Sequence, residues 1–496
     1  MLRWVHESPD PSRNPSERNQ PVTDARLEGP ISGNPFLLVG AQNLDTAGYV
    51  REEWFLASTA CAYTLHGERS QDGAWQAARG ARAAFKTRIV VFRPNDPRGF
   101  SGTVVVEWLN VSGGVDAAPD WLFLHRHLMR EGAAWVGVSA QKAGIDGGGL
   151  VPGIPLKRAD GERYGSLEHP GDAFAFDIYT EVGRLLRRGG SGPLGRLEPR
   201  RLIAIGESQS AGFLVSYVNA VDPIERCFDA FLIHGRPGAA ADLDGGYLRA
   251  PRDGDLRNVG AVMQVGHRIR EDVRVPVLTF QSETDVVTLG GGRARQPDFE
   301  RFRLWELAGA AHFDTYGLVA SQIDQEGVAI EALAFHLAPT DKPMGMPAKE
   351  PVNSGPQQHY VLNAALQHLD RWLRDGSPPP EAPRLEATDA MATKLVRDEL
   401  GIVRGGIRTP WVDAPSAVLS GDSPGGDGFT FLFGRTKALD EATLGRLYPG
   451  GAEEHLRRFE AATAAAVAAG FLLEADADEI RALARHGRQP SGWRTE

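Results

Sequence analysis

Cysteines and long apolar runs are both scarce in this sequence. Its 496 residues include two cysteines, Cys61 and Cys227, and no CxxC pair. A disulfide-rich scaffold or a cysteine zinc site needs more thiols than this, so we expect both side chains to be buried like small hydrophobic residues. No uninterrupted run of about 18 apolar residues exists, so the sequence predicts no membrane span.

Clusters of positive charge are also missing. Lysine and arginine number 54 against 64 acidic residues, which gives a net charge of −10. A nucleic-acid partner is therefore not expected, because phosphate binding needs clustered cations. The sequence contains no GxxxxGK[ST] phosphate-binding loop and no HExxH zinc helix. The run Gly290-Gly291-Gly292 follows an acidic turn and does not open a helix after a strand, so we expect no dinucleotide or other organic cofactor, and no metal.

The N-terminal segment, residues 1–30, is polar and rich in proline. It lacks the apolar centre of a signal peptide. We therefore expect a flexible leader at the start of a cytoplasmic protein. The whole composition, with 42% hydrophobic and 24% charged residues, is that of a packed globular protein.

Short β-branched runs alternate with amphipathic segments between residues 102 and 312. Strands of this kind are buried on both faces, and their alternation with helices implies parallel pairing. We therefore predict an α/β fold built on a doubly wound and mostly parallel sheet. The expected strands are Tyr49–Leu56, Thr87–Phe92, Thr103–Trp108, Ala134–Ser139, Arg201–Ile205, Phe228–Ile233, Val277–Phe280 and Arg303–Leu307, and the expected helices are Trp121–Arg130, Asp172–Arg188 and Gln209–Asn219.

Two segments interrupt this alternation, and the run Pro378-Pro379-Pro380 follows it. Residues 145–171 are rich in glycine and proline, and residues 236–272 are too long for a structureless connection in a compact domain. We predict that both are lid insertions in a core that spans residues 31–377. Residues 378–496 are predicted to form a C-terminal extension packed on this core. Further helical patterns lie at about 321–337, 356–374 and 452–486.

The run Gly206-Glu207-Ser208-Gln209-Ser210 follows a buried strand and opens a helix. This is the setting of a nucleophile elbow, a tight turn that exposes a serine hydroxyl above the edge of a sheet. The positions two before and two after the serine must be small. Gly206 meets this condition fully, and Ser210 meets it although glycine is usual there. The alternative role for Ser208 is that of a helix N-cap, which is common for serine.

Acidic and histidine candidates follow Ser208 in the chain order typical of the α/β-hydrolase fold. Glu283 and Asp285 come directly after a late strand. His312 follows the next strand, in a loop of small residues. Asp285 has the better spacing from the strand end, with Glu283 as the alternative acid. In this hypothesis His312 takes the proton of Ser208 while the acid orients the imidazole.

An oxyanion hole needs two N–H donors. One is expected from the backbone of Gln209, directly after the nucleophile, and the other from the loop after an earlier strand. In this chain that loop is Glu107–Gly114. We predict the second donor in the backbone near Asn110 or Val111, the alternative being a glycine turn without a catalytic role.

Several of these motifs, with others along the chain, carry a resemblance to a known family. The segments are Val106–Val111, Gly137–Lys142, Tyr164–Asp172, Gly206–Ser210, Glu283–Asp285, Ala308–His312 and Gly405–Pro410. In them the chain resembles a large bacterial family of α/β-hydrolase-domain proteins that is distantly similar to carboxylesterases. The resemblance implies that Ser210 is a normal residue of the family's elbow. It also implies that the region after residue 378 belongs to the same unit as the core.

Together these features predict a serine hydrolase that cleaves small-molecule carboxylic esters through an acyl-enzyme on Ser208. A first alternative is an acyltransferase, or an enzyme that opens or forms lactones in specialised metabolism, since these start from the same acyl-enzyme. A second alternative is a non-catalytic binding protein on a hydrolase scaffold. The presence of Ser208, Asp285 and His312 speaks against this second alternative.

Overall fold

The computed structural model describes residues 25–190, 192–247 and 264–486. Parts of three predicted segments lie outside these described residues, namely residues 1–24 of the leader, residues 248–263 of the second lid and residues 487–496 of the C-terminal extension. None of the helices formed by the described residues is long and apolar enough to cross a membrane.

One large sheet organises the described chain. Its strands are β1 (Arg26–Glu28), β2 (Tyr49–His66), β3 (Gln76–Pro94), β4 (Thr103–Trp108), β5 (Ala134–Val138), β6 (Arg201–Glu207), β7 (Ala230–His234), β8 (Val277–Ser282) and β9 (Phe302–Leu307). They lie in the order β1-β2-β3-β5-β4-β6-β7-β8-β9. The run from β5 to β9 is parallel, whereas β1 pairs antiparallel with β2, β2 with β3, and β3 with β5. The predicted mostly parallel α/β sheet is confirmed.

Helices cover both faces of this sheet. Those before the C-terminal region are α1 (Pro119–Arg130), α2 (Lys142–Asp146), α3 (Leu156–Ala159), α4 (Gly161–Tyr164), α5 (Ala175–Arg188), α6 (Gln209–Ser216), α7 (Asp222–Glu225), α8 (Glu283–Val287), α9 (Thr315–Leu318), α10 (Ile330–His336) and α11 (Gln357–Asp375). Successive residues of a strand face opposite sides of its sheet. Val106 of β4 shares a hydrophobic cluster with Phe176 of α5 and Phe213 of α6. Its neighbour Val105 shares another with Trp121 of α1, so the sheet is doubly wound as predicted.

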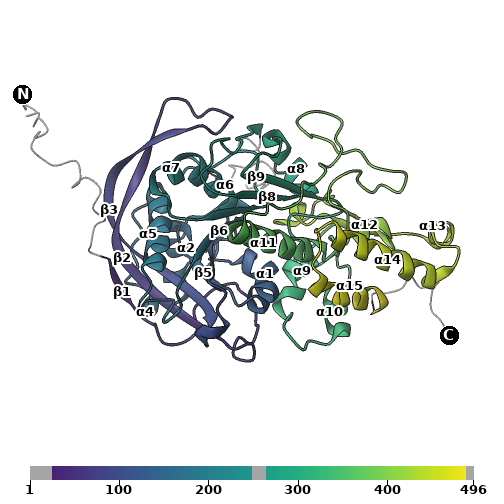
Figure 1. Ribbon diagram of the computed structural model, residues 1–496, viewed down its shortest axis with the longest axis horizontal. Helices are drawn as coiled ribbons and strands as arrows, with labels where there is room; N and C mark the ends of the chain where they lie inside the picture. The colour runs from purple at the N-terminus through teal and green to yellow at the C-terminus, as the bar shows by residue number, and fades with distance from the viewer. Residues whose placement is uncertain (1–24, 191, 248–263, 487–496) are drawn as a thin grey trace, which may run out of the picture.

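A long hairpin forms one side of the molecule, where β2 and β3 sweep past the rest of the sheet (Figure 1). These strands have 18 and 19 residues, so the predictions Tyr49–Leu56 and Thr87–Phe92 captured only parts of them. Most side chains at the start of β3 are exposed, which removes the apolar pattern that marks a strand. The prediction of a flexible leader is also wrong for Arg26–Glu28 at its end, because these residues form β1 and pair with β2.

The first predicted lid insertion, residues 145–171, is mostly packed rather than draped over the sheet. Leu156, Tyr164 and Leu167 form a buried hydrophobic cluster with Phe55 of β2. This part of the insertion therefore covers the antiparallel side of the sheet, and the two lids remain a prediction.

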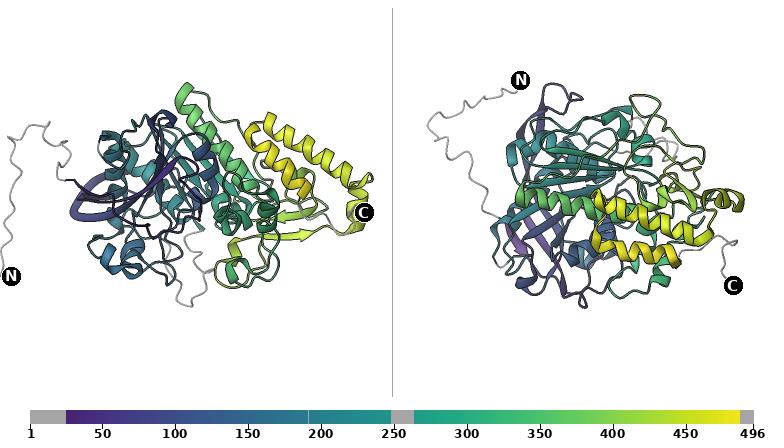
Figure 2. Two further views of the ribbon diagram at one scale, coloured as in Figure 1. Left: turned by 90° about the horizontal axis from the view of Figure 1, so that it is seen from below. Right: turned by 45° about the vertical axis from the view of Figure 1, so that its right-hand side comes forward.

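The C-terminal region packs against the sheet at the side opposite the hairpin (Figure 1). Its elements are α12 (Pro410–Asp413), β10 (Ala417–Ser420), β11 (Arg435–Ala438), α13 (Glu441–Leu447), α14 (Gly451–Ala468) and α15 (Glu474–His486). Figure 2 shows α14 and α15 beside α11, and Phe459 and Ile480 join the same hydrophobic cluster as Leu362 of α11. Ile407 also forms a parallel bridge with Leu307 of β9. These contacts support the proposal that the region after residue 378 is packed on the core.

Two smaller predictions need correction. The helical pattern at about 321–337 yields α10 only from Ile330, since Gly327 has a φ of +83° and the chain turns there. Both cysteines are free, and Cys227 is buried as predicted, but Cys61 is half-buried. The Sγ of Cys61 lies 3.1 Å from a carboxylate oxygen of Asp177, so this thiol has a polar partner on α5.

Candidate active site

Ser208 occupies the turn between β6 and α6. Its φ of 60° and ψ of −116° lie outside the regions that a residue with a Cβ prefers, so the backbone is strained there. The Ser208 N–H donates to the carbonyl of His234 at 2.9 Å, which fixes the turn to the end of β7. The side chain makes no capping hydrogen bond to α6. Ser208 therefore has the geometry of a nucleophile elbow, and the N-cap alternative is not supported.

The residues two before and two after Ser208 pack tightly against each other. A Cβ at Gly206 would lie 3.1 Å from the Cβ of Ser210, so a side chain at position 206 would require its neighbours to shift. Ser210 itself is fully buried, and its hydroxyl has no hydrogen-bond partner among the described residues. The turn thus accepts serine in place of the usual glycine at this position.

His312 lies between Ser208 and Asp285. Its Nδ1 is 2.5 Å from Oδ1 of Asp285, and its Nε2 is 2.8 Å from Oγ of Ser208. With Nδ1 donating to Asp285, Nε2 is left to accept the serine hydroxyl proton. The histidine loop follows β9, and a Cβ at Gly235 would lie 3.2 Å from two atoms of the imidazole ring. Glycine at this position therefore leaves the room that the ring needs.

The carboxylate of Asp285 is held by the first turn of α8. Ser282 is the N-cap of that helix, and its N–H donates to Oδ2 of Asp285 at 2.6 Å. In return, the backbone N–H of Asp285 donates to the Ser282 hydroxyl, which completes a capping box. This leaves Oδ1 directed at His312. The strand-to-helix junction thus orients the acid that the sequence favoured by spacing.

Glu283, the alternative acid, has different partners. Its carboxylate accepts hydrogen bonds from the N–H groups of Gly309 at 2.7 Å and Gly421 at 3.1 Å. Arg397 also donates to it at 2.9 Å. Burial raises the pKa of Glu283, and the charge of Arg397 opposes that rise. Glu283 therefore joins the histidine loop to the C-terminal region and is not in contact with His312.

Glu207 is a site residue without a role in the sequence-based hypothesis, although it stands in the elbow directly before Ser208. Its Oε1 lies 2.9 Å from Nε2 of His312, at ion-pair distance, and has no hydrogen-bond partner among the described residues. Asn110 holds the other oxygen through its Nδ2 at 3.2 Å. The side chain is 5% exposed, so water screens this contact weakly. The site therefore places a second carboxylate next to the histidine.

The two carboxylates set the protonation of His312. Burial lowers the pKa of the imidazole, but the charges of Glu207 and Asp285 outweigh burial and raise that pKa to about 10. A second buried pair lies close by, with Nδ1 of His234 at 2.9 Å from Oδ1 of Asp120. Burial lowers the pKa of His234 to about 4, whereas burial and the charge of Glu207 raise the pKa of Asp120. This second pair is therefore favoured in its uncharged form, and His312 is the cation of the site.

The two predicted oxyanion donors near the end of β4 differ in whether their backbone N–H group already has a hydrogen-bond acceptor. The N–H of Asn110 donates to the carbonyl of Ala117 at 2.9 Å, so it is already used. The N–H of Val111 has no acceptor among the described residues. The N–H of Gln209 lies in the first turn of α6, where helix donors lack partners within the helix. Gln209 and Val111 thus remain the candidates, and Asn110 instead supports Glu207.

A cavity of about 720 Å³ opens onto Ser208 and His312. Of the two predicted lids, the described residues contribute only Leu150 and Pro237 to its lining. Other walls come from residues 313–344, after the histidine, and from 429–433 in the C-terminal region. No local sequence pattern predicts these walls, because they are far from Ser208 along the chain and come beside it only in the folded protein.

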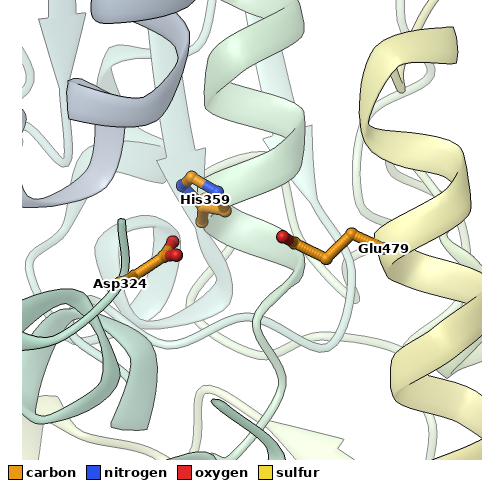
Figure 3. A group of neighbouring side chains, drawn as sticks. All are labelled: Asp324, His359 and Glu479. Atoms are coloured by element: carbon orange, nitrogen blue, oxygen red, sulfur yellow. The ribbon is translucent and has the colours of Figure 1, made fainter. Parts of the chain in front are cut away.

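Another group of side chains could in principle hold a metal ion. Asp324 comes from the loop before α10, His359 from α11 and Glu479 from α15, and their side chains converge (Figure 3). Their candidate ligand atoms all lie within 4.8 Å of one another. One imidazole with two carboxylates is a donor set that suits zinc.

The partners of the two carboxylates argue for an ion-pair network at this position. Nη1 of Arg126 lies 2.6 Å from Asp324, and its Nη2 lies 3.5 Å from Glu479. Tyr316 donates to Asp324 at 2.7 Å, and Tyr360 donates to Glu479 at 2.8 Å. A metal would have to displace a guanidinium that is already ion-paired with both acids. We therefore interpret the group as a link between α15 and the core.

Comparisons with solved structures find distant likenesses. A serine hydrolase without a lid from Xanthomonas campestris is 12% identical over 51% of this chain and 86% of its own, with a TM-score of 0.27. A Pyrococcus furiosus esterase is 11% identical over 56% of this chain and 89% of its own, with a TM-score of 0.28. A thermostable esterase from Pseudomonas putida is 14% identical over 50% of this chain and 68% of its own, with a TM-score of 0.25.

The family comparison covers far more of the sequence. No curated protein matches the chain closely enough to count as a relative. By contrast, a family model described as alpha/beta hydrolase domain matches residues 16–482. This span includes the elbow, the histidine loop and nearly all of the C-terminal region. The chain belongs to the alpha/beta hydrolase domain family.

Proposed function

We propose that the protein hydrolyses carboxylic esters through an acyl-enzyme on Ser208. In this proposal His312 is the general base and acid, and Asp285 orients it. One observation carries the proposal: Nε2 of His312 lies 2.8 Å from the Oγ of a serine on a strained turn, with Asp285 at 2.5 Å on the other side of the ring. This is the hydrogen-bond relay that activates a serine hydroxyl.

The first half-reaction forms the acyl-enzyme. As Oγ of Ser208 attacks the ester carbonyl carbon, its proton passes to Nε2 of His312. The negative charge that develops on the carbonyl oxygen is stabilised by the N–H groups of Gln209 and Val111. The imidazolium then gives its proton to the leaving alcohol, and the carbon–oxygen bond to that alcohol breaks.

The second half-reaction releases the acid. His312 takes a proton from a water molecule, which attacks the acyl carbon and forms a second oxyanion in the same place. The bond between the acyl carbon and Oγ breaks, and Ser208 regains its proton from the imidazolium. The products are a carboxylic acid and the free enzyme.

Hydrolysis of p-nitrophenyl acetate by the full chain tests this function. We expect Ser208→Ala to lose activity by about 10⁴-fold or more, as removal of a triad serine does elsewhere. Ser210→Ala is the matched control, because it removes a hydroxyl two residues away that has no partner among the described residues. Equal activity of Ser208→Ala and wild type would contradict the proposal. Analysis of products with added methanol separates hydrolysis from acyl transfer.

A further inference from the structure

The cavity beside Ser208 is apolar along most of its wall. Its polar lining residues are Asn110, Ser112, Glu207, Ser208, His312, Gln322 and His336, and the others are hydrophobic residues or glycines. Its volume of about 720 Å³ lies in the range of pockets that enclose a drug-sized ligand. An acetyl group would leave most of this space unfilled.

Residues 429–433 form one wall of this cavity, and we call them the aromatic wall. Phe429, Phe431, Leu432 and Phe433 all line the cavity. Leu432 packs with Leu289, which follows α8, and it also packs in the hydrophobic cluster that contains Phe433. The aromatic wall therefore contacts both the segment after α8, through Leu289, and the cluster that contains Leu318 at the end of α9.

Contacts with the histidine loop fix the position of the aromatic wall. A Cβ at Gly434 would lie 2.8 Å from the Cβ of Ala311, so the chain passes directly against the residue before His312. The N–H of Asn353 donates to the carbonyl of Phe433 at 2.9 Å, and Nδ2 of Asn353 donates to the carbonyl of Gly309 at 2.9 Å. One asparagine thus connects the wall to the loop that carries the histidine.

Among the described residues that line the cavity, none offers an unpaired positive charge to a negatively charged substrate. No lysine or arginine occurs among its described lining residues, and Glu207 is the one carboxylate there. Of the two histidines, His312 is the cation of the site, but its charge is already paired with the carboxylates of Asp285 at 2.5 Å and Glu207 at 2.9 Å. Nδ1 of His336 is bonded to the carbonyl of Ala332 at 2.8 Å. An anionic group in the cavity would lose its hydration and find no matching charge.

We propose that the substrates of Ser208 are uncharged esters with a large apolar group, and that the aromatic wall determines how large this group can be. The inference rests on the proposed ester hydrolysis and names the class of ester. It also gives the C-terminal region a role in the reaction, as a determinant of specificity. Phe431 is the side chain to test, because it lines the cavity and is half-buried.

The first experiment measures kcat/KM for p-nitrophenyl esters from acetate to dodecanoate. We expect a rise of about fourfold per added methylene, the factor that corresponds to about 0.8 kcal/mol of apolar burial. The rise should stop at the chain length that reaches the aromatic wall, and Phe431→Ala should move that limit to longer chains. Phe299→Ala is the matched control. Phe299 is also half-buried, but it lies near the start of β9, whereas the histidine loop follows the end of that strand. This variant should therefore leave the limit unchanged.

A second comparison tests charge. An ester whose acyl chain ends in a carboxylate should have a kcat/KM lower by about 10²-fold or more than the uncharged ester of equal length, because an unpaired charge is costly to bury. Equal rates for the two esters would overturn the proposed substrate class. So would a preference for acetate over every longer chain, and in both cases Ser208-dependent hydrolysis of acetate would leave the proposed function standing.

Binding to the Ser208→Ala protein gives a test that needs no turnover. Calorimetry should show that 1-decanol binds at least about tenfold more tightly than decanoate, in line with the cost of burying an unpaired charge. The Phe431→Ala change in the same background should weaken 1-decanol binding, and Phe299→Ala should not. If wild type hydrolyses no ester while these binding results hold, the proposed function fails and the apolar binding site remains. Equal binding of both ligands overturns the inference.

Discussion

Glu207 gives the site a property that a triad alone would not have. Its Oε1 lies 2.9 Å from the same nitrogen of His312 that faces Ser208. Because both groups are about 5% exposed, the contact has little access to water. We predict that replacing this carboxylate with an amide in Glu207→Gln shifts the pH dependence of the enzyme.

The direction and size of the shift follow from the charges around the imidazole. Burial lowers the pKa of His312, and the charges of Glu207 and Asp285 outweigh burial and raise that pKa to about 10. Removal of an adjacent opposite charge lowers such a pKa by about 1–3 units. Only the neutral imidazole can take the serine proton, so kcat/KM rises with pH through this pKa. The rising limb of Glu207→Gln should therefore lie about 1–3 pH units below that of wild type.

The same substitution should also lower the maximum kcat/KM, which is reached at the high-pH plateau. The carboxylate of Glu207 also stabilises the imidazolium that forms in the transition state, and the amide does not. We expect a lower plateau in Glu207→Gln at high pH, together with a larger fraction of plateau activity at neutral pH. Asp120 and His234, the other titratable pair in contact with this region, are favoured in uncharged forms and should contribute little to the limb.

A pH-stat assay with a soluble aliphatic ester measures these limbs without the rapid background loss of p-nitrophenyl esters in alkali. The conservative variant Glu207→Asp retains the charge at a greater distance, so its limb should fall between the other two. If the limbs of wild type and Glu207→Gln coincide, the carboxylate does not act on His312. A limb that moves to higher pH in Glu207→Gln would also refute the reasoning.

Three other predictions separate neighbouring residues. Asp285→Asn should lower kcat by about 10⁴-fold, as loss of a triad acid does elsewhere. Glu283→Gln should instead retain most of kcat and lose about 1–3 kcal/mol of unfolding free energy, because it disturbs buried hydrogen bonds. Steady-state kinetics and urea unfolding distinguish the two variants, and the reverse pattern would exchange the roles of the two acids. Gly235→Ala should lower kcat/KM by about 10²-fold, since its Cβ would press on the His312 ring and displace it, and unchanged kinetics would contradict this. Ser210→Ala should keep its activity and match or exceed wild-type stability by about 1 kcal/mol, because it removes a buried hydroxyl without a partner; a clear fall in melting temperature would show that the hydroxyl is bonded after all.

Much of the sheet could be predicted because its parallel strands are short, apolar and separated by helices. Thr103–Trp108, for instance, is buried at every position and matches its prediction at both ends. The hairpin of β2 and β3 could not be delimited in this way. Its polar, exposed end is held by pairing with a neighbouring strand, and pairing leaves no apolar pattern in the sequence.

The site shows the same division between local and long-range information. The elbow at Ser208 has a local signature, since small residues must flank a strained turn between a strand and a helix. In the sequence, spacing alone favours Asp285 over Glu283, and the capping box that directs the Asp285 carboxylate is seen only in the folded chain. The aromatic wall follows His312 by more than a hundred residues, so only the folded chain shows that it lines the cavity.

The central claim is that Ser208 is the nucleophile, and covalent labelling tests it most directly. A fluorophosphonate reacts with a serine whose hydroxyl is activated by a neighbouring base. Intact mass spectrometry of the treated wild type should show one added phosphonyl group, and peptide mapping should locate it on Ser208. Ser208→Ala should remain unlabelled while Ser210→Ala is labelled like wild type. Labelling of Ser208→Ala to the same extent, or a modified peptide elsewhere in the chain, would contradict the account.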